Sequence, residues 1–231
     1  LFMAFVRRYW NWCRRFRHRC GYGVHSPSDF FLITSVIYEQ LPYYAYHTLE
    51  KKHFSNFLPH YRKKINRLLF RLVNYLHPQS LIEVGVGNGA SMSYMRAARS
   101  AMKSCTIKGK DLDKTLMKLE EDIQLLGGID MLHIGHTPYY KEVFEKALLS
   151  VSERSCIIVG NIYQSKEKKE WWKQLKEDER VRLTFDLYDI GLVFFDKKRI
   201  KQNYINNKIK KKKKKSVIYT RTGDKGTTSL V

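Results

Sequence analysis

The chain has 231 residues and a mass of 27.5 kDa, which is enough for one α/β domain with appendages. Its composition, 43% hydrophobic and 13% aromatic, can fill a core and excludes wholesale disorder and a collagen-like structure. The formal net charge of +21 suggests a polyanionic partner, such as nucleic acid or an anionic membrane.

Most of this charge lies near the two ends of the chain. Residues 1–25 carry six arginines and no acid, and residues 197–215 carry eleven lysines or arginines and no acid. Residues 26–196 have 24 basic and 21 acidic side chains, which leaves a net charge of +3. The charge therefore gives little support to nucleic acid as a partner, and none is expected for the body of the protein.

The cysteines and the apolar segments bear on the compartment. Four cysteines lie far apart without a C-x-x-C pair, so we expect neither a disulfide framework nor a zinc site. No apolar run approaches the ~20 residues that span a bilayer. The apolar start Leu1–Val6 is followed by arginines, the reverse of the charge order in a secretory signal. We expect a cytoplasmic protein with no transmembrane segment.

Residues 1–25 are predicted to form a basic aromatic arm. The aromatic residues recur at intervals of three, four and seven positions, which is typical of an amphipathic helix through Cys20. In one interpretation the aromatic stripe packs on the domain and the arginines face solvent. In the other the arm contacts an anionic surface or nucleic acid.

Residues 26–78 are predicted to form a helical cap. Ser26 can cap a helix that runs to about Tyr38, because the next residue is a proline suited to the first helical position. A second helix is marked by apolar residues at steps of three and four over 65–76, and Pro78 closes it.

Residues 79–205 change to short apolar runs that alternate with helical stretches, the pattern of βαβ units. The last two runs flank a short turn at 189–191, which requires an antiparallel hairpin. The sequence therefore predicts an α/β, Rossmann-like sheet that is mostly parallel and ends in an antiparallel hairpin. The expected strands are 81–84, 105–109, 129–134, 156–159, 181–188 and 192–195, and the expected helices begin near 91 and cover 112–126, 140–148 and 166–179.

The functional prediction depends on the glycine loop after the first of these strands, Glu83-Val84-Gly85-Val86-Gly87-Asn88-Gly89. Glycines let the backbone turn tightly and let a ligand approach the main chain, while the following helix offers free N–H groups. The spacing differs from the G-x-G-x-x-G of dinucleotide sites. The alternative is a glycine-rich turn without a ligand, because short glycine motifs also arise by chance.

An acid two residues before the first glycine resembles motif I of class I S-adenosylmethionine-dependent methyltransferases. The resemblance extends to other segments. Residues 20–205 are similar to a Bacteroides-type bacterial methyltransferase family with an N-terminal helical cap, and the segments that carry this similarity are the motif, Gly23-Val24-His25-Ser26-Pro27, Tyr43-Tyr44 and the run 172–195. The resemblance implies S-adenosylmethionine as the cofactor and methyl transfer to an oxygen or nitrogen of a small-molecule acceptor. It also implies that the methionyl part is held by Glu83, Gly85, Gly87, Asn88 and Gly89, and the ribose hydroxyls by Asp111.

The chain also departs from the pattern of that family. Only residues 112–128 separate Asp111 from the next strand, so one βα unit of ~30 residues is expected to be missing. Gly160-Asn161-Ile162-Tyr163 stands where the family tends to show paired acids, so no metal site is expected. A degenerate relative without catalytic activity is therefore an alternative function.

Two histidines complete the candidate site. His133-Ile134-Gly135-His136 stands where the family usually shows an Asp-Gly-x-His segment. A histidine inside a strand is typically a satisfied core or edge residue, which is the expectation for His133. His136, just beyond the strand, could act as a general base toward a hydroxyl nucleophile and is the candidate catalytic residue.

Residues 206–231 are predicted to be a disordered lysine-rich tail outside the domain. Residues 217–231 resemble the N-terminus of ATP:corrinoid adenosyltransferases, in which this segment helps to bind ATP phosphates. Because the resemblance stops before a helical bundle, we do not expect that activity in this chain. We hypothesise that an adenine-rich run of lysine codons led into a neighbouring reading frame. The alternative is that the basic ends bind nucleic acid or a membrane surface.

Overall fold

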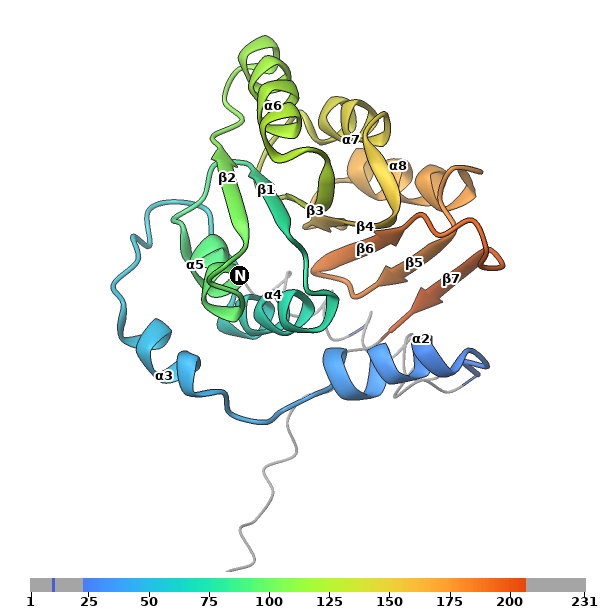
Figure 1. The fold of residues 1–231 in the computed structure, drawn as a ribbon, viewed down its shortest axis with the longest axis horizontal. Helices are drawn as coiled ribbons and strands as arrows, with labels where there is room; N and C mark the ends of the chain where they lie inside the picture. Colours follow the sequence, from blue (N-terminus) through green and yellow to red (C-terminus); the bar gives the residue numbers. More distant parts are fainter. Residues whose placement is uncertain (1–9, 11–22, 207–231) are drawn as a thin grey trace, which may run out of the picture.

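The structure is a computed structural model that describes Trp10 and residues 23–206. One seven-stranded sheet lies between two layers of helices (Figure 1). The helical elements are α2 (Pro27–Phe31), η1 (Leu32–Ile37), α3 (Tyr44–Lys51), α4 (Lys63–Leu76), α5 (Ala90–Ala98), α6 (Leu112–Leu126), α7 (Tyr140–Leu148) and α8 (Lys166–Glu177). The strands are β1 (Ser80–Val84), β2 (Lys103–Ile107), β3 (Ile129–Ile134), β4 (Val151–Gly160), β5 (Leu183–Asp186), β6 (Ile190–Phe194) and β7 (Gln202–Ile205).

Two predicted segments fall outside this part of the chain. Of the basic aromatic arm, the structure describes only Trp10 and residues 23–25. The lysine-rich tail and the adenosyltransferase-like segment, residues 207–231, also lie outside the described residues. The boundaries of the four predicted segments therefore stay predictions.

The sheet confirms the predicted α/β fold class. Its strand order is β2-β1-β3-β4-β6-β5-β7, in which the first four strands are parallel and β6 runs antiparallel to both β4 and β5. The expected hairpin is thus present, because β5 and β6 pair from Leu183 with Phe194 to Asp186 with Gly191. The missing βα unit is confirmed as well, since β2 lies at the edge and only α6 connects it to β3.

Three elements differ from the sequence prediction. Strand β7, which pairs in parallel with β5, was not expected because its residues are short of apolar periodicity. Helix α3 was not expected either. Strand β4 begins at Val151 instead of Cys156. The sequence does not indicate the earlier start, because the first half of β4 is polar and exposed; it pairs with β3 through an irregularity between Ile129 and Met131.

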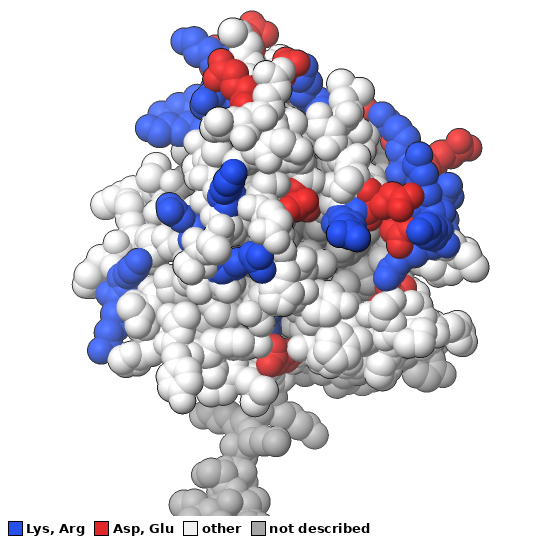
Figure 2. Space-filling model, viewed as in Figure 1, with Lys and Arg blue, Asp and Glu red and all other residues white. Residues whose placement is uncertain are grey.

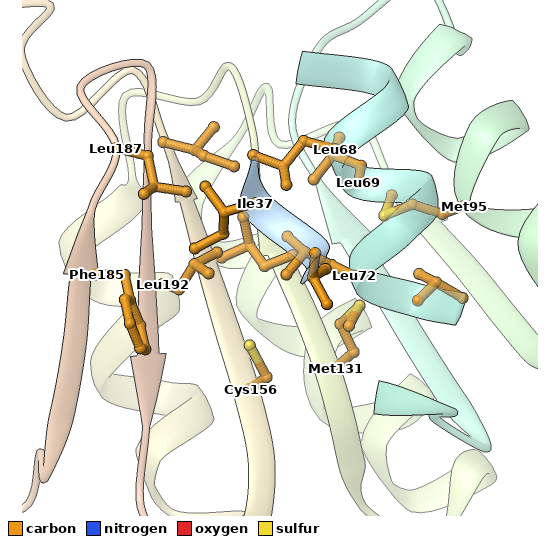
Figure 3. Close-up of a cluster of buried hydrophobic side chains, with 14 of the residues drawn as sticks. Ile37, Leu68, Leu69, Leu72, Met95, Met131, Cys156, Phe185, Leu187 and Leu192 are labelled. Carbon is orange, nitrogen blue, oxygen red and sulfur yellow. The ribbon is translucent and has the colours of Figure 1, made fainter. Parts of the chain in front are cut away.

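The two faces of the sheet have separate apolar cores. Helices η1, α4 and α5 cover one face, where leucine, isoleucine and methionine side chains meet those of the central strands (Figure 3). Helices α6, α7 and α8 cover the other, with Phe144 and Trp172 among the fully buried side chains. Because β1, β3 and the second half of β4 are buried on both sides, these segments are rich in apolar residues in the sequence.

Local signals fix several helix ends. Ser26 accepts a hydrogen bond from the amide of Asp29, with Pro27 at the first helical position, as predicted. At the other end of the cap, α4 stops at Leu76, and His77 takes the left-handed conformation before Pro78. Helix α6 ends at Gly127, whose φ of 74° is one that glycine adopts without strain. Short-range signals therefore set the start of α2 and the ends of α4 and α6.

Candidate functional site

The sheet has a topological switch point between β1 and β3. From β1 the chain continues outward to β2, whereas β3 lies on the other side of β1 and continues to β4. The loops that leave the carboxyl ends of β1 and β3 therefore diverge and open a crevice, which is where open α/β sheets bind ligands. Two predicted features occupy this crevice: the glycine loop 85–89 and the turn that contains His136.

The first glycine of the loop is required by a close backbone approach. Gly85 has a φ of +143°, and a Cβ added there would lie 2.7 Å from the backbone nitrogen of His136. The Gly85 amide donates to the carbonyl of Ile107, and the Val86 amide donates to that of His136. The loop is thereby held against the ends of β2 and β3, which the sequence motif alone does not show.

The rest of the loop leaves backbone donors free. Asn88 organises it: its side-chain oxygen accepts from the amide of Ala90, and its amide group donates to the carbonyl of Ser55. Within the described part of the chain, the amides of Gly87 and Gly89 have no hydrogen-bond partner. Gly89, with a φ of +79°, also starts α5, so these donors lie at a helix N-terminus that favours negative charge.

The acid that ends β1 belongs to a buried chain of hydrogen bonds. The Glu83 carboxylate accepts from the hydroxyl of Ser91 and lies 2.8 Å from Nδ1 of His133. Nε2 of His133 is 3.3 Å from the hydroxyl oxygen of Tyr61, so the chain of hydrogen bonds continues to Tyr61. His133 is completely buried with both nitrogens paired, as expected for a histidine inside a strand.

Tyr61 covers one side of the crevice, and nothing in the sequence predicts this position. Its hydroxyl occupies the place of the missing side chain of Gly160, whose Cβ would lie 1.8 Å away. Burial, followed by the charge of Glu83, raises the pKa of the Tyr61 phenol, so it stays protonated. Two residues before Tyr61, the carbonyl of Pro59 accepts a hydrogen bond from the amide of Asn88. This bond fixes residues 59–61 on the glycine loop.

His136 lies at the centre of the crevice. Its ring packs on Tyr61 with centroids 4.8 Å apart, and its Nδ1 lies 3.0 Å from the side-chain nitrogen of Asn161. Its Nε2 is buried and has no hydrogen-bond partner among the described residues. Burial, with a smaller contribution from His133, lowers the pKa of His136 to about 4. The ring is therefore neutral at pH 7, and Asn161 is a site residue that the sequence prediction missed.

The crevice contains a cleft of about 180 Å³ that gathers the predicted residues. Glu83, the glycine loop and His136 line it together with residues 59–61. Asp111 is the exception. It is exposed, is not among the lining residues and caps α6 by accepting a hydrogen bond of 2.9 Å from the amide of Lys114. The predicted ribose role of Asp111 thus stays a prediction.

The described residues offer neither a metal-binding cluster nor a membrane-spanning helix. No group of three or more histidine, cysteine, aspartate or glutamate side chains is placed to hold a metal ion within the described range. None of the helices in the same range combines the length and apolar character needed to cross a bilayer.

Comparison with known proteins finds similarity in structure only. No protein-family model and no curated protein matches the chain. The O-methyltransferase TomG from Streptomyces achromogenes, solved with S-adenosylmethionine, is 13% identical over 59% of this chain and 81% of TomG, with a TM-score of 0.42. An O-methyltransferase from Bacillus cereus in complex with S-adenosylhomocysteine is 14% identical over 65% of this chain and 87% of its own, with a TM-score of 0.43.

A third structure is similar at the same level. The methyltransferase PaMTH1 from Podospora anserina, with S-adenosylhomocysteine bound, is 10% identical over 68% of this chain and 98% of its own, with a TM-score of 0.44. At these identities and TM-scores the chain is assigned to no family, and its function is inferred from the residues of the cleft.

Proposed function

We propose that this protein is an S-adenosylmethionine-dependent methyltransferase that acts on an oxygen or nitrogen of a small-molecule acceptor. One observation carries the proposal: the motif Glu83-x-Gly85-x-Gly87-x-Gly89 begins at the end of β1, beside the switch point of the sheet, and lines a cleft. An acid, three glycines and free helix N-terminal amides at this point suit a zwitterionic ligand with a bulky nucleoside group.

The residues present fit the methionyl end of that cofactor. Gly87 and Gly89 offer unpartnered amides to a carboxylate, and Glu83 lines the same cleft and could accept from an ammonium group. The cleft alone is smaller than most small-molecule sites, which measure ~300–1,000 Å³. It adjoins a second cavity of about 500 Å³, with which it shares Pro59 and His136. The combined space can therefore hold both a cofactor and an acceptor.

The chemistry asks little of the protein. When bound, S-adenosylmethionine supplies a methyl group already activated by the sulfonium charge, whose C–S bond breaks with the electron pair left on sulfur. The chain must align the acceptor with that group, exclude water and hold the acceptor's proton. Tyr61 and Pro59 cover the cleft and so limit the access of water.

His136 is our proposed proton acceptor. In the orientation seen here, the Asn161 amide donates to Nδ1, so Nε2 carries the proton and can donate to a ligand. Rotation of that amide by 180° would let its oxygen accept from Nδ1–H and would leave the Nε2 lone pair free to take a proton. The lowered pKa keeps the ring unprotonated at pH 7, as a base requires.

Isothermal titration calorimetry of the full chain with S-adenosylmethionine and S-adenosylhomocysteine tests the proposal. We expect micromolar binding of both, and at least a hundredfold loss in Gly87→Arg. A Cβ at Gly87 meets only the carbonyl of Pro59 at 3.6 Å, and its φ is not in the left-handed region, so the variant should fold. Thermal unfolding of the variant provides the control. Absence of binding to the wild-type protein would refute the proposal.

A degenerate, non-catalytic domain is the second candidate, and the missing βα unit beside β2 favours it. It predicts weak or no cofactor binding in the same titration. Binding of a polyanion through the basic ends is not favoured by the described body. On the face shown in Figure 2, basic and acidic side chains are interspersed. A steep salt dependence of nucleic-acid or vesicle binding, lost on deletion of residues 1–25 and 206–231, would support that role.

A further inference from the structure

The cavity of about 500 Å³ beside the cleft lies between the start of α7 and the start of α8. It is lined by His136, Tyr140, Ser165, Glu167 and Lys168, among others. Its position next to the proposed cofactor cleft makes it the place where an acceptor would sit. Its polar groups then indicate which class of acceptor it takes.

Lys168 is the most unusual of these groups. The residue is only 3% exposed, yet its ammonium nitrogen has no ion pair and no hydrogen bond among the described residues. Its recorded contact is with the ring of Tyr140, whose centroid lies 4.5 Å from Nζ. Burial lowers the pKa of Lys168 to about 8, so the side chain is still mostly protonated at pH 7. A buried ammonium without an acid is costly, and a bound anion would remove that cost.

Two further polar groups in the same lining lack partners. The Tyr140 hydroxyl is buried and unpaired, and so is Nε2 of His136. Burial raises the pKa of Tyr140, so its hydroxyl keeps the proton that it can donate. The ring cannot easily turn away, because Trp171 packs edge-on against it at 4.9 Å.

The acidic group in the lining does not neutralise Lys168. The Glu167 carboxylate points to a different cation, because its Oε1 lies 2.5 Å from Nζ of Lys141. Glu167 is also largely exposed, whereas Lys168 is buried. The cavity therefore combines one uncompensated positive charge with two unpaired neutral polar groups and has no free acid among its described lining residues.

We propose that this cavity binds a small organic anion, whose carboxylate or phosphate group pairs with Lys168 and accepts a hydrogen bond from Tyr140. Its assignment as the acceptor site rests on the proposed function, whereas the preference for an anion does not. The acceptor would thus carry a negatively charged group at one end and the hydroxyl or amine to be methylated nearer to His136.

Matched probes test the charge preference directly. We would screen benzoate with benzamide, 4-hydroxybenzoate with 4-hydroxybenzamide, and phenyl phosphate by ligand-observed NMR, and then measure dissociation constants. The variants are Lys168→Met, which keeps most of the side-chain length, and Lys169→Met, which removes the same charge from the exposed neighbouring position. Tyr140→Phe removes the hydroxyl alone.

We expect at least one anionic probe to bind tenfold more tightly than its neutral reference. The reference is the matching benzamide for each benzoate, and benzamide for phenyl phosphate. Lys168→Met should weaken that probe tenfold or more, Tyr140→Phe about threefold, and Lys169→Met less than twofold. The difference between carboxylate and phosphate probes identifies the anionic group. Equal binding of charged and neutral probes, no binding of any anion, or an equal effect of the two lysine variants would overturn the proposal.

Cofactor titration of the same samples separates this inference from the proposed function. If the anion binds through Lys168 but S-adenosylmethionine does not bind, the anion site stands and the methyltransferase proposal fails. If the cofactor binds but no anion preference is found, only the present inference fails.

Discussion

Two buried charged side chains near the carboxyl edge of the sheet, Glu83 and Lys168, have opposite surroundings. The Glu83 carboxylate has two partners, the Ser91 hydroxyl and the His133 ring, and the same chain of bonds continues to Tyr61. The Lys168 ammonium has an aromatic ring beside it and no partner of opposite charge among the described residues.

The difference teaches what each residue contributes. A buried carboxylate held by two hydrogen bonds is part of the architecture, and here it positions the loop and, through His133, the residue Tyr61. A buried charge without a partner lowers stability and marks a place where function overrides packing. Removal of the Glu83 carboxylate should therefore lower the free energy of unfolding, and removal of the Lys168 ammonium should raise it.

The largest loss of stability is expected on removal of the Glu83 carboxylate. Glu83→Ala leaves a buried histidine nitrogen and a serine hydroxyl unpaired, so we expect the free energy of unfolding to fall by about 3 kcal/mol. Glu145→Ala is the matched control, because Glu145 pairs with Arg180 on the surface, where both side chains are about half exposed. That pair should be worth about 1 kcal/mol or less. Equal losses in urea unfolding would contradict the structural role of Glu83.

The opposite sign is expected for Lys168→Met. The folded pKa of Lys168, about 8, lies below the ordinary value of 10.5, so the fold disfavours the charged form. At about 1.4 kcal/mol per pKa unit, Lys168→Met should raise the free energy of unfolding at pH 7 by about 3 kcal/mol.

The pH dependence gives this prediction a second readout. The penalty is fully present below pH 8 and disappears as pH rises from 8 to 10.5, so wild type and variant should converge over that interval. The other titratable groups around the cavity, His136, Tyr140 and Glu167, are the same in both proteins and largely cancel in the difference. Urea unfolding at several pH values measures the difference in the free energy of unfolding between wild type and Lys168→Met. For Lys169→Met the same difference should stay close to zero. A destabilised Lys168→Met protein would contradict the inference that the charge lacks a partner.

Sequence reasoning succeeded where short-range signals act. The bounds of α6 and β3, the cap at Ser26 and the hairpin of β5 and β6 follow from periodicity and turn residues. The absence of a second βα unit after β2 followed from chain length alone. The position of the glycine loop between β1 and α5 follows from the same short-range signals, whereas its role toward a ligand stays a prediction.

It failed where the site depends on long-range packing. Nothing near Tyr61 in the sequence indicates that its hydroxyl fills the space above Gly160. The sequence likewise does not indicate that the carboxylate of Asp111 caps its own helix, where it accepts from the amide of Lys114; its ribose role stays a prediction. At Lys168, by contrast, the sequence does carry a signal. Lys168, Trp172 and Leu175 lie on one helix face at steps of four and three, so a lysine stands where an apolar residue belongs.

The smallest effect separates the glycine loop from an ordinary glycine turn. Gly89 and Gly127 have φ values of +79° and +74°, and a Cβ at either would meet no atom within 4 Å. Gly89→Ala and Gly127→Ala should therefore each lower stability by about 1 kcal/mol, from backbone strain alone. Only Gly89 lines the cleft, so only Gly89→Ala should raise the dissociation constant of S-adenosylmethionine, by about three- to tenfold. Calorimetry on both variants measures this. If the two alanines affect cofactor binding equally, the loop acts as a turn, and Glu83 and its partners would then hold an architecture that no ligand uses.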